Sequence, residues 1–326
     1  MTDPAVLVVT CLTDVTADLV ITALNERGAR VVRLDPADAL NGELEFSVSI
    51  GGAEGWRGTV STPTRHVGVE EVATVYYRRP SAWESTHPDS QVRRFVQTEA
   101  RHGLGGLLHD LPDAAYVNHP AAVSRAEYKP GQLQAAARAG FSVPPTLITN
   151  DPEPAREFAA KHAPVVYKPM RGLPAAEDGT AGAIWAQRIA PSAIDASVSA
   201  TAHMFQAEVP KTADARVTVV GGRVFASAIT APGQVLDWRR TDWESLHHEP
   251  LAVPGQVAGM MRAYLEACGL VFGCFDFALT GSGDDPADWV WMECNPNGQW
   301  GWLPDAEDIA VAFADVLTDP AARSRR

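Results

Sequence analysis

The order of apolar and amphipathic segments predicts an α/β domain at the start of the chain. Apolar runs typical of buried strands are interspersed with segments of helical periodicity. In two shorter segments apolar and polar residues alternate, which predicts the two strands of a hairpin. Strands are predicted at 5–13, 30–35, 44–50, 56–62, 72–80 and 116–120, and helices at 14–29 and 90–111. Because the chain opens as strand, helix and strand, the first sheet should be parallel. We assign this unit to residues 1–119.

Two smaller α+β units are predicted after residue 119. The first, at 120–204, has a helical segment around Pro130, two strands flanking a helix, and a Gly-rich loop at 171–182. The second, at 205–326, opens with a strand that ends at Pro210. Its further elements are a hairpin at 214–230, a helix at 255–269, strands at 271–281 and 288–298, and a helix at 305–319.

The composition is that of an ordinary soluble protein and argues against several classes of function. Hydrophobic residues make up 46% and charged residues 21% of the 326 positions, and the formal net charge is −13. Non-specific nucleic-acid binding relies on basic surface, so we expect no nucleic-acid partner. No apolar run reaches the roughly 18 residues of a membrane helix, and the N-terminus lacks a basic signal segment. We therefore expect no membrane association.

The cysteines indicate the compartment. Cys11, Cys268, Cys274 and Cys294 form no CxxC pair and lie in apolar or strand-like surroundings. This pattern favours buried free thiols over disulfides and argues against a zinc site. Free thiols suit a reducing compartment, so we expect a cytoplasmic protein.

Polar side chains gather where the last two strands meet. Side chains alternate along a strand, so Glu293 and Asn295 share one face while Cys294 points to the other. If the strands pair, Asp276 lies beside Glu293. Two adjacent carboxylates repel unless a cation lies between them, and oxygen ligands of this kind suit Mg²⁺. The alternative, ordinary exposed strand ends with turn-forming residues, stays equally open at this point.

A magnesium site of this type implies a nucleotide, and therefore cationic side chains for its phosphates. The sequence has neither a GxxxxGK[ST] loop nor a complete GxGxxG motif. Lys168 instead interrupts an apolar strand, and a lysine there needs an anion or must reach solvent. Lys129, Arg216 and Arg239 are further candidates. Taken singly, each is more often a solvated surface residue or part of a surface ion pair.

The ordered set resembles the ATP-grasp superfamily from about residue 120 to the end. The superfamily pattern is a lysine before the small subdomain, a strand lysine, a hinge strand at adenine, and Asp…Glu-x-Asn for magnesium. The matching positions here are Lys129, Lys168, "QAEV" at 206–209, Asp276, Glu293 and Asn295. The hinge departs slightly from the commoner Gln-Glu sequence.

A closer resemblance is to the graspetide synthetases, the microviridin-type maturases of ribosomal peptides. Four segments carry it: "VYYRRP" (75–80), "DARVTVVGGRVFA" (214–226), "DWR" (237–239) and "NPNGQWGWL" (295–303). The sequence looks most like the actinobacterial branch. The resemblance implies an N-terminal pre-ATP-grasp (Rossmann-like) domain followed by an ATP-grasp fold of two α+β subdomains.

The resemblance also implies the reaction and its participants. ATP would activate Asp or Glu carboxylates of a precursor peptide as acyl phosphates, which Ser or Thr hydroxyls or a Lys amine then attack. The peptide would carry a leader and a Thr/Ser/Glu/Asp-rich core, and the enzyme is expected to be a homodimer. Arg216 and Arg239 would be catalytic, and Asp276, Glu293 and Asn295 would hold Mg²⁺. ATP would be held by Lys129, Lys168, Gln206, Ala207, Glu208, Val209 and Asp214.

Two rival interpretations stay open from the sequence. An ATP-grasp amino-acid ligase of the glutathione-synthase or glutamate-ligase kind would use the same nucleotide and metal residues. A catalytically silent peptide-binding module would lose the metal residues that this chain retains. Arg78 and Arg79 are expected either to touch an acidic core peptide or to form a structural ion pair. The Gly-rich loop, with Gly172, Gly179 and Gly182, is expected to close over the phosphates.

Overall fold

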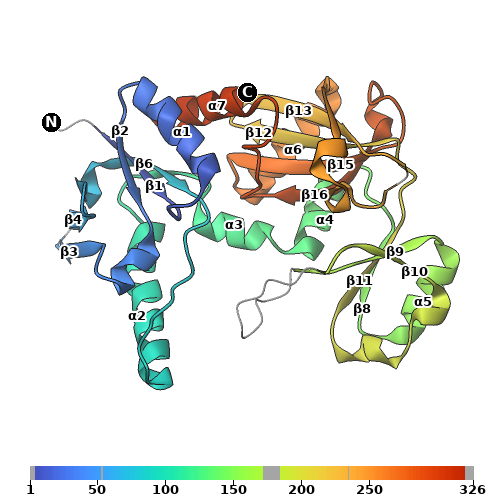
Figure 1. Cartoon of the computed structure of the whole chain (residues 1–326), viewed down its shortest axis with the longest axis horizontal. Coiled ribbons are helices and arrows are strands. Elements are labelled where there is room, and N and C mark those ends of the chain that lie inside the picture. The colour runs from blue at the N-terminus through green and yellow to red at the C-terminus, as the bar shows by residue number, and fades with distance from the viewer. Residues whose placement is uncertain (1–3, 53, 172–183, 234, 320–326) are drawn as a thin grey trace.

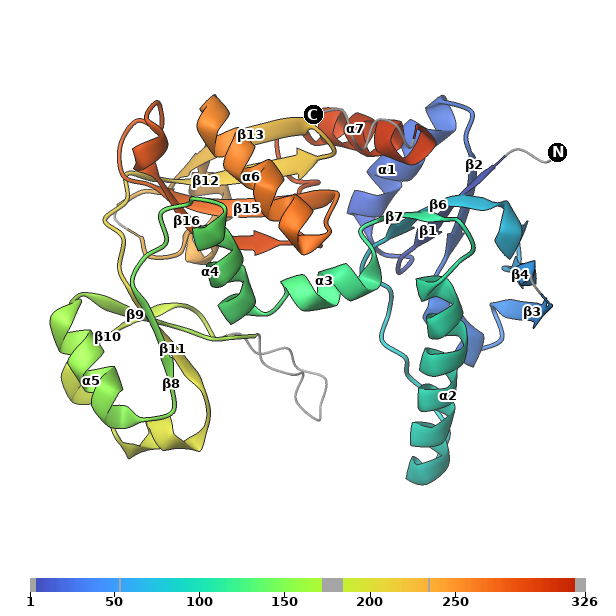
Figure 2. The same ribbon diagram turned by 180° about the vertical axis from the view of Figure 1, so that it is seen from behind.

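The chain folds into three units (Figure 1). The computed structural model describes residues 4–52, 54–171, 184–233 and 235–319. The N-terminal domain and the C-terminal subdomain lie side by side, with the small subdomain beside the latter. Figure 2 shows α3 (Pro120–Ala126) running from the first unit towards α4 (Lys129–Arg138).

The N-terminal domain is built on a parallel sheet with the strand order β2-β1-β6-β7. This confirms the predicted parallel sheet. Its strands are β1 (Ala5–Val9), β2 (Arg30–Leu34), β6 (Val72–Tyr77) and β7 (Ala115–Val117). The helices that cover it are α1 (Val15–Glu26), capped by the side chain of Asp14, and α2 (Ser90–His109).

Successive side chains of β1 point to opposite faces of this sheet, and each face is covered by a different helix. Val6 and Val8 pack with α1, whereas Leu7 and Val9 pack with the C-terminal half of α2. The predicted hairpin is also present and pairs with a third strand on the α2 side. It consists of β3 (Glu45–Gly51), β4 (Glu54–Ser61) and β5 (His66–Gly68). The domain is therefore a sheet with two different coverings.

The small subdomain is an antiparallel sheet covered by one helix, α5 (Pro152–Lys161). Its strand order is β10-β9-β11-β8. The strands are β8 (Thr146–Thr149), β9 (Val165–Lys168), β10 (Gln187–Ile189) and β11 (His203–Ala207). The boundary expected between residues 204 and 205 falls inside β11, because this strand pairs with β8 and β9.

The C-terminal subdomain is an antiparallel sheet of five strands in the order β14-β13-β12-β15-β16. The strands are β12 (Ala213–Val220), β13 (Arg223–Thr230), β14 (His247–Pro250), β15 (Phe272–Leu279) and β16 (Trp289–Asn295). One face packs against α4 and α6 (Gly255–Cys268). The other face carries the charged residues of the site.

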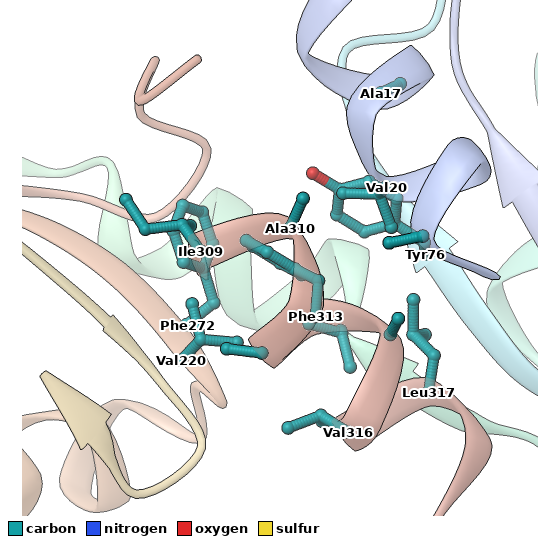
Figure 3. Packing of buried hydrophobic residues seen from close by; sticks show 14 of the residues in the cluster. Ala17, Val20, Tyr76, Val220, Phe272, Ile309, Ala310, Phe313, Val316 and Leu317 are labelled. Atoms are coloured by element: carbon teal, nitrogen blue, oxygen red, sulfur yellow. The ribbon is translucent and has the colours of Figure 1, made fainter. Parts of the chain in front are cut away.

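The terminal helix α7 (Ala306–Thr318) joins the two large units. Phe313 packs on Tyr76 of the first sheet and on Phe272 of the last, with ring centroids 5.0 and 4.9 Å away (Figure 3). Val20 of α1 and Val220 of β12 belong to the same buried cluster. The shared core fixes one domain against the other, so a site between them can be rigid.

The helix predicted around Pro130 is two helices, with the break at Glu127 and Tyr128. Pro130 lies in the first turn of α4, where a missing backbone N–H removes no helical hydrogen bond. This break places Lys129 at the first position of α4. The four cysteines are free thiols, as predicted, but only Cys274 and Cys294 are buried. Within the described ranges, no helix is long and apolar enough to cross a membrane.

Candidate active site

The site is centred on the pairing of β15 and β16. Asp276 lies opposite Glu293 in the register, as the sequence suggested. The pairing is irregular beside Asp276, because Phe277 lies opposite Trp291 and Met292 is an extra residue. This bulge lets Trp291 and Cys294 both face the buried core, while Glu293 faces the site.

Three cationic side chains surround the two carboxylates. Arg216 donates from Nη1 to Oδ1 of Asp276 at 2.9 Å, and Arg239 donates from Nη2 to Oδ2 of Asp276 at 2.7 Å. Lys129 Nζ donates to Oε2 of Glu293 at 2.9 Å, and Arg239 also approaches Glu293 Oε1 at 3.4 Å. Burial alone would raise the pKa of Glu293, but Lys129 and Arg239 hold it well below its ordinary value.

Asn295 completes a set of oxygen-bearing side chains suited to a hard cation. Its Nδ2 lies 3.3 Å from both Asp276 Oδ2 and Glu293 Oε1, so all three side chains converge. Turning the amide about its last bond would present its oxygen at the same place. No group of three or more His, Cys, Asp or Glu residues suited to a metal occurs in the described ranges. A metal site here would therefore use two carboxylates and one carboxamide.

A cavity of about 340 Å³ lies on one side of this cluster. It is lined by the hinge residues Gln206, Ala207, Glu208 and Val209, by Lys129, Lys168, Asp214 and Arg239, and by Asp276 and Glu293. Ten of the twelve predicted site residues thus meet at one cavity. Burial lowers the pKa of Lys168 to about 8, although nearby Glu293 opposes the shift.

Local contacts fix the hinge side chains. Gln206 Nε2 donates to Thr146 Oγ1 at 2.9 Å, and that hydroxyl donates onward to Pro144 O. Because the Thr146 hydroxyl gives its only proton to Pro144 O, it can only accept from Gln206. The Gln206 atom that faces Thr146 must therefore be the amide nitrogen. The other amide atom, Oε1, is buried and lacks a partner within the described part of the chain.

Two ion pairs in the first cavity include predicted nucleotide residues. Glu208 binds Arg188 through two hydrogen bonds of 2.6 and 2.7 Å. Lys211 Nζ lies 2.6 and 2.7 Å from the two carboxylate oxygens of Asp214. Sequence reasoning missed Lys211, although its spacing of three residues from Asp214 and its place after Pro210 offered a signal.

A second cavity, of about 1280 Å³, lies on the other side of the cluster. It contains the remaining two predicted residues, Arg216 and Asn295. Lys129, Arg239 and Glu293 line both cavities. Its walls come from all three units: Arg79 from the N-terminal domain, Ile148 from the small subdomain, and residues 295–299 at the end of β16 and after it. The charged cluster therefore forms the partition between a small and a large cavity.

Arg78 and Arg79 have different places. Arg78 is fully buried and pairs with Asp14 at 2.8 Å, so it forms the structural ion pair that was one of the two expectations. It also donates to Gly298 O at 3.0 Å and to Gln299 Oε1 at 2.6 Å. Arg79 lines the second cavity. The sequence did not indicate that Arg78 of the N-terminal domain contacts Gly298 and Gln299 in the segment after β16.

The segment after β16 approaches the site closely at Gly298. A Cβ atom there would lie 2.4 Å from Cys274 Cβ and 3.0 Å from Arg216 Nη2. Gln299 O accepts a hydrogen bond from that same nitrogen of Arg216 at 2.7 Å. The "NPNGQWGWL" segment therefore holds Arg216 in place. Residues 172–182 of the expected phosphate loop lie outside the described residues.

The chain resembles known proteins in sequence and in fold. Residues 5–124 match the family model described as the MvdD pre-ATP grasp domain. Residues 5–124 therefore form a pre-ATP-grasp domain of the MvdD type. This confirms the expected fold class, whereas the actinobacterial placement stays a prediction. A search of curated protein sequences found no match.

Three solved structures resemble the chain over nearly its whole length. Macrocyclase MdnC from Microcystis aeruginosa MRC, bound with precursor peptide MdnA, is 26% identical, with 96% of this chain and 99% of that chain covered and a TM-score of 0.82. The Chryseobacterium gregarium RiPP-associated ATP-grasp ligase, in complex with ADP and a leader and core peptide, is 25% identical, with 97% of each chain covered and a TM-score of 0.84. Macrocyclase MdnB from Microcystis aeruginosa MRC is 28% identical, with coverages of 97% and 99% and a TM-score of 0.76.

Proposed function

We propose that this ATP-grasp protein closes macrocycles in a ribosomally made precursor peptide. A side-chain carboxylate of the peptide attacks the γ-phosphorus of ATP, the bond to the bridging oxygen breaks, and ADP leaves. A Ser or Thr hydroxyl, or a Lys amine, of the same peptide then attacks the acyl phosphate. Phosphate leaves, the nucleophile loses its proton, and an ester or amide forms. Each link removes one water from the peptide.

The arrangement of the two cavities carries this proposal. The smaller cavity, with the hinge strand and both lysines, suits the nucleotide. The larger cavity of about 1280 Å³ exceeds the roughly 300–1,000 Å³ of ordinary small-molecule sites. A peptide therefore fits it better than a free amino acid does. Because the charged cluster separates the cavities, a carboxylate entering from the peptide side meets the γ-phosphate there.

Each site residue receives a role from its position. Lys129 and Lys168 hold phosphate oxygens in the small cavity, where the lowered pKa of Lys168 matters for its charge. Arg216 and Arg239 present forked guanidinium groups to the γ-phosphate and the acyl phosphate. Asp214 helps shape the nucleotide cavity through its pair with Lys211. The enzyme's work is positioning and charge neutralisation, so no enzyme nucleophile is needed.

The chain also offers groups suited to binding Mg²⁺ and adenine. Asp276, Glu293 and Asn295 would hold Mg²⁺, which supplies positive charge to the phosphates when bound. At the hinge, the amides of Ala207 and Glu208 already donate to Pro145 O and Pro164 O. The partnerless Oε1 of Gln206 instead suits the amino group of adenine, while Val209 supplies backbone groups.

The similar proteins support the peptide as substrate. MdnC is bound with a precursor peptide, and the Chryseobacterium gregarium ligase with ADP and a leader and core peptide. We extend to this chain a peptide partner with a leader and a Thr/Ser/Glu/Asp-rich core, and a homodimeric, cytoplasmic enzyme. The chain itself contributes the peptide-sized cavity beside its phosphate-binding residues.

The test takes a short peptide with a Thr/Ser/Glu/Asp-rich core, sought among the reading frames beside the gene, and incubates it with the protein, ATP and Mg²⁺. Mass spectrometry should show the loss of one water for each link, only when ATP is present. Asp276→Asn should abolish the loss, whereas Asp284→Asn, in an exposed turn, should preserve it. An unchanged peptide mass together with phosphate release stimulated by free amino acids would identify an amino-acid ligase instead.

A further inference from the structure

Three tryptophans form one side of the large cavity. The ring centroids of Trp243 and Trp302 lie 4.9 Å apart at nearly a right angle, and Trp238 lies 5.5 Å from Trp302. All three line the second cavity. We call Trp238, Trp243 and Trp302 the tryptophan wall. The proposed mechanism assigns no role to these side chains.

The wall is anchored on its inner side and open on its outer side. Trp238 is buried with Ile229 and Leu246. Trp243, by contrast, keeps 49% of its surface exposed. An indole held by neighbouring rings but left open to a cavity is a surface at which binding can remove apolar area from water.

His248 lies behind the wall. His248 lies 5.5 Å from both Trp243 and Trp302, measured between ring centroids. Its two ring nitrogens are buried and have no hydrogen-bond partner among the described residues, and burial lowers its pKa. Burial thus disfavours a charged imidazolium behind the wall, which suits an apolar ligand group.

The wall adjoins the reacting groups. The guanidinium carbon of Arg239 lies over the ring of Trp238, 4.9 Å from its centroid. The same guanidinium donates to Asp276 at 2.7 Å. Arg239 therefore belongs to the charged cluster and also contacts the wall, so a ligand in the cavity can touch both.

Further apolar side chains line the large cavity. Tyr128, Ile148 and Ile184 are exposed and line this same cavity. With Trp243, they account for four of the large hydrophobic side chains that the described surface exposes. Exposed apolar groups that gather around one cavity mark a binding site for an apolar group.

We propose that the tryptophan wall binds an aromatic side chain of the peptide, close in sequence to the carboxylate that becomes activated. The cationic cluster takes the carboxylate and the adjoining wall takes the ring, so both groups of one short segment are held together. The inference rests on the proposed function for its choice of a peptide. The contact itself requires no catalysis and can be measured without ATP.

The test is binding of a short synthetic probe, acetyl-fluorophenylalanyl-glycyl-glutamyl-glycinamide, followed by fluorine NMR on the full-length protein. We expect Trp243→Ala to weaken binding of the probe about tenfold, the size of effect typical of a truncated aromatic anchor. Trp302→Leu should weaken it as well. The matched control is Phe95→Ala, because Phe95 is an exposed aromatic residue of α2 that lines neither cavity.

A second probe with alanine in place of fluorophenylalanine should compete about tenfold less well. Three outcomes would each overturn the proposal. Both probes could compete equally well, the first probe could bind equally to wild type and Trp243→Ala, or it could fail to bind wild type. Circular dichroism and melting temperature establish that each variant is folded. If the precursor is macrocyclised but Trp243→Ala leaves its KM unchanged, the wall proposal fails and the proposed function stands. If the probe binds as expected but the precursor is never macrocyclised, the proposed function fails and the aromatic binding site stands.

Discussion

Arg78 and Gln299 connect the N-terminal domain to the candidate active site by a hydrogen bond of 2.6 Å from Nη2 to Oε1. Asp14 holds Arg78 from one side, and Thr16 also donates to Gln299 Oε1 at 2.9 Å. The backbone carbonyl of Gln299 in turn accepts from Arg216. The pre-ATP-grasp domain thus helps set the position of the guanidinium that pairs with Asp276.

Replacing Gln299 should slow the reaction without weakening nucleotide binding. Gln299→Ala removes the acceptor for Arg78 and Thr16, so the segment that holds Arg216 loses its anchor. We expect kcat to fall about ten- to a hundredfold, as for other supports of a reacting group, while the Kd for ADP stays unchanged. Gln299→Glu keeps the acceptor and should retain most activity. Equal kcat for wild type and Gln299→Ala would contradict this role.

Arg78 should matter chiefly for stability. Arg78→Met leaves Asp14 buried without its charged partner, which typically costs about 3–5 kcal/mol of unfolding free energy. Urea unfolding measures the loss. The neighbouring substitution Arg79→Met is the control, since Arg79 is exposed, and it should change stability by less than about 0.5 kcal/mol. Similar losses at both positions would refute the buried ion pair.

Gly298 should not tolerate a side chain. A methyl group there meets Cys274 at 2.4 Å, so β15 or the following segment must shift, and Arg216 with it. We expect Gly298→Ala to lower both the melting temperature and kcat. Gly259→Ala is a matched control, because a Cβ in that turn of α6 meets nothing within 4 Å. That change should stabilise the protein by about 0.4–1 kcal/mol.

The affinity for ATP should depend on the charge of Lys168. Its pKa of about 8 means that the free protein loses this charge as the pH rises through that value. Phosphate binds the protonated amine, so the Kd for ATP should increase between pH 7 and 9. Near pH 9, binding of ATP should be accompanied by uptake of a proton. Lys168→Arg stays protonated and should flatten the profile. Calorimetry in two buffers measures both effects, and identical profiles for the two proteins would exclude Lys168.

Local sequence patterns were enough for much of the fold and of the site. Alternation along β15 and β16 placed Asp276, Glu293 and Asn295 on one face, because a strand's period does not depend on distant contacts. The bulge at Met292 does not follow from alternation, since it arises from the way two strands pair. The placement of β11 has the same cause, because its partners β8 and β9 decide the sheet to which it belongs.

Contacts between distant segments were beyond the reach of local patterns. Arg78 and Gln299 are 221 positions apart, and no spacing rule connects them. The tryptophan wall likewise combines Trp238 and Trp243 with Trp302 from the segment after β16. Lys211 is different, because its pairing with Asp214 is local and its position after the hinge was visible in the sequence.

Transfer of oxygen from the peptide to phosphate tests the central claim most directly. The precursor peptide is labelled with the heavy oxygen isotope in its Asp and Glu side-chain carboxylates and incubated with the enzyme, ATP and Mg²⁺. An acyl phosphate intermediate predicts one labelled oxygen in the released phosphate for every link formed, read by mass spectrometry. Links that form while the released phosphate carries no label would contradict the account.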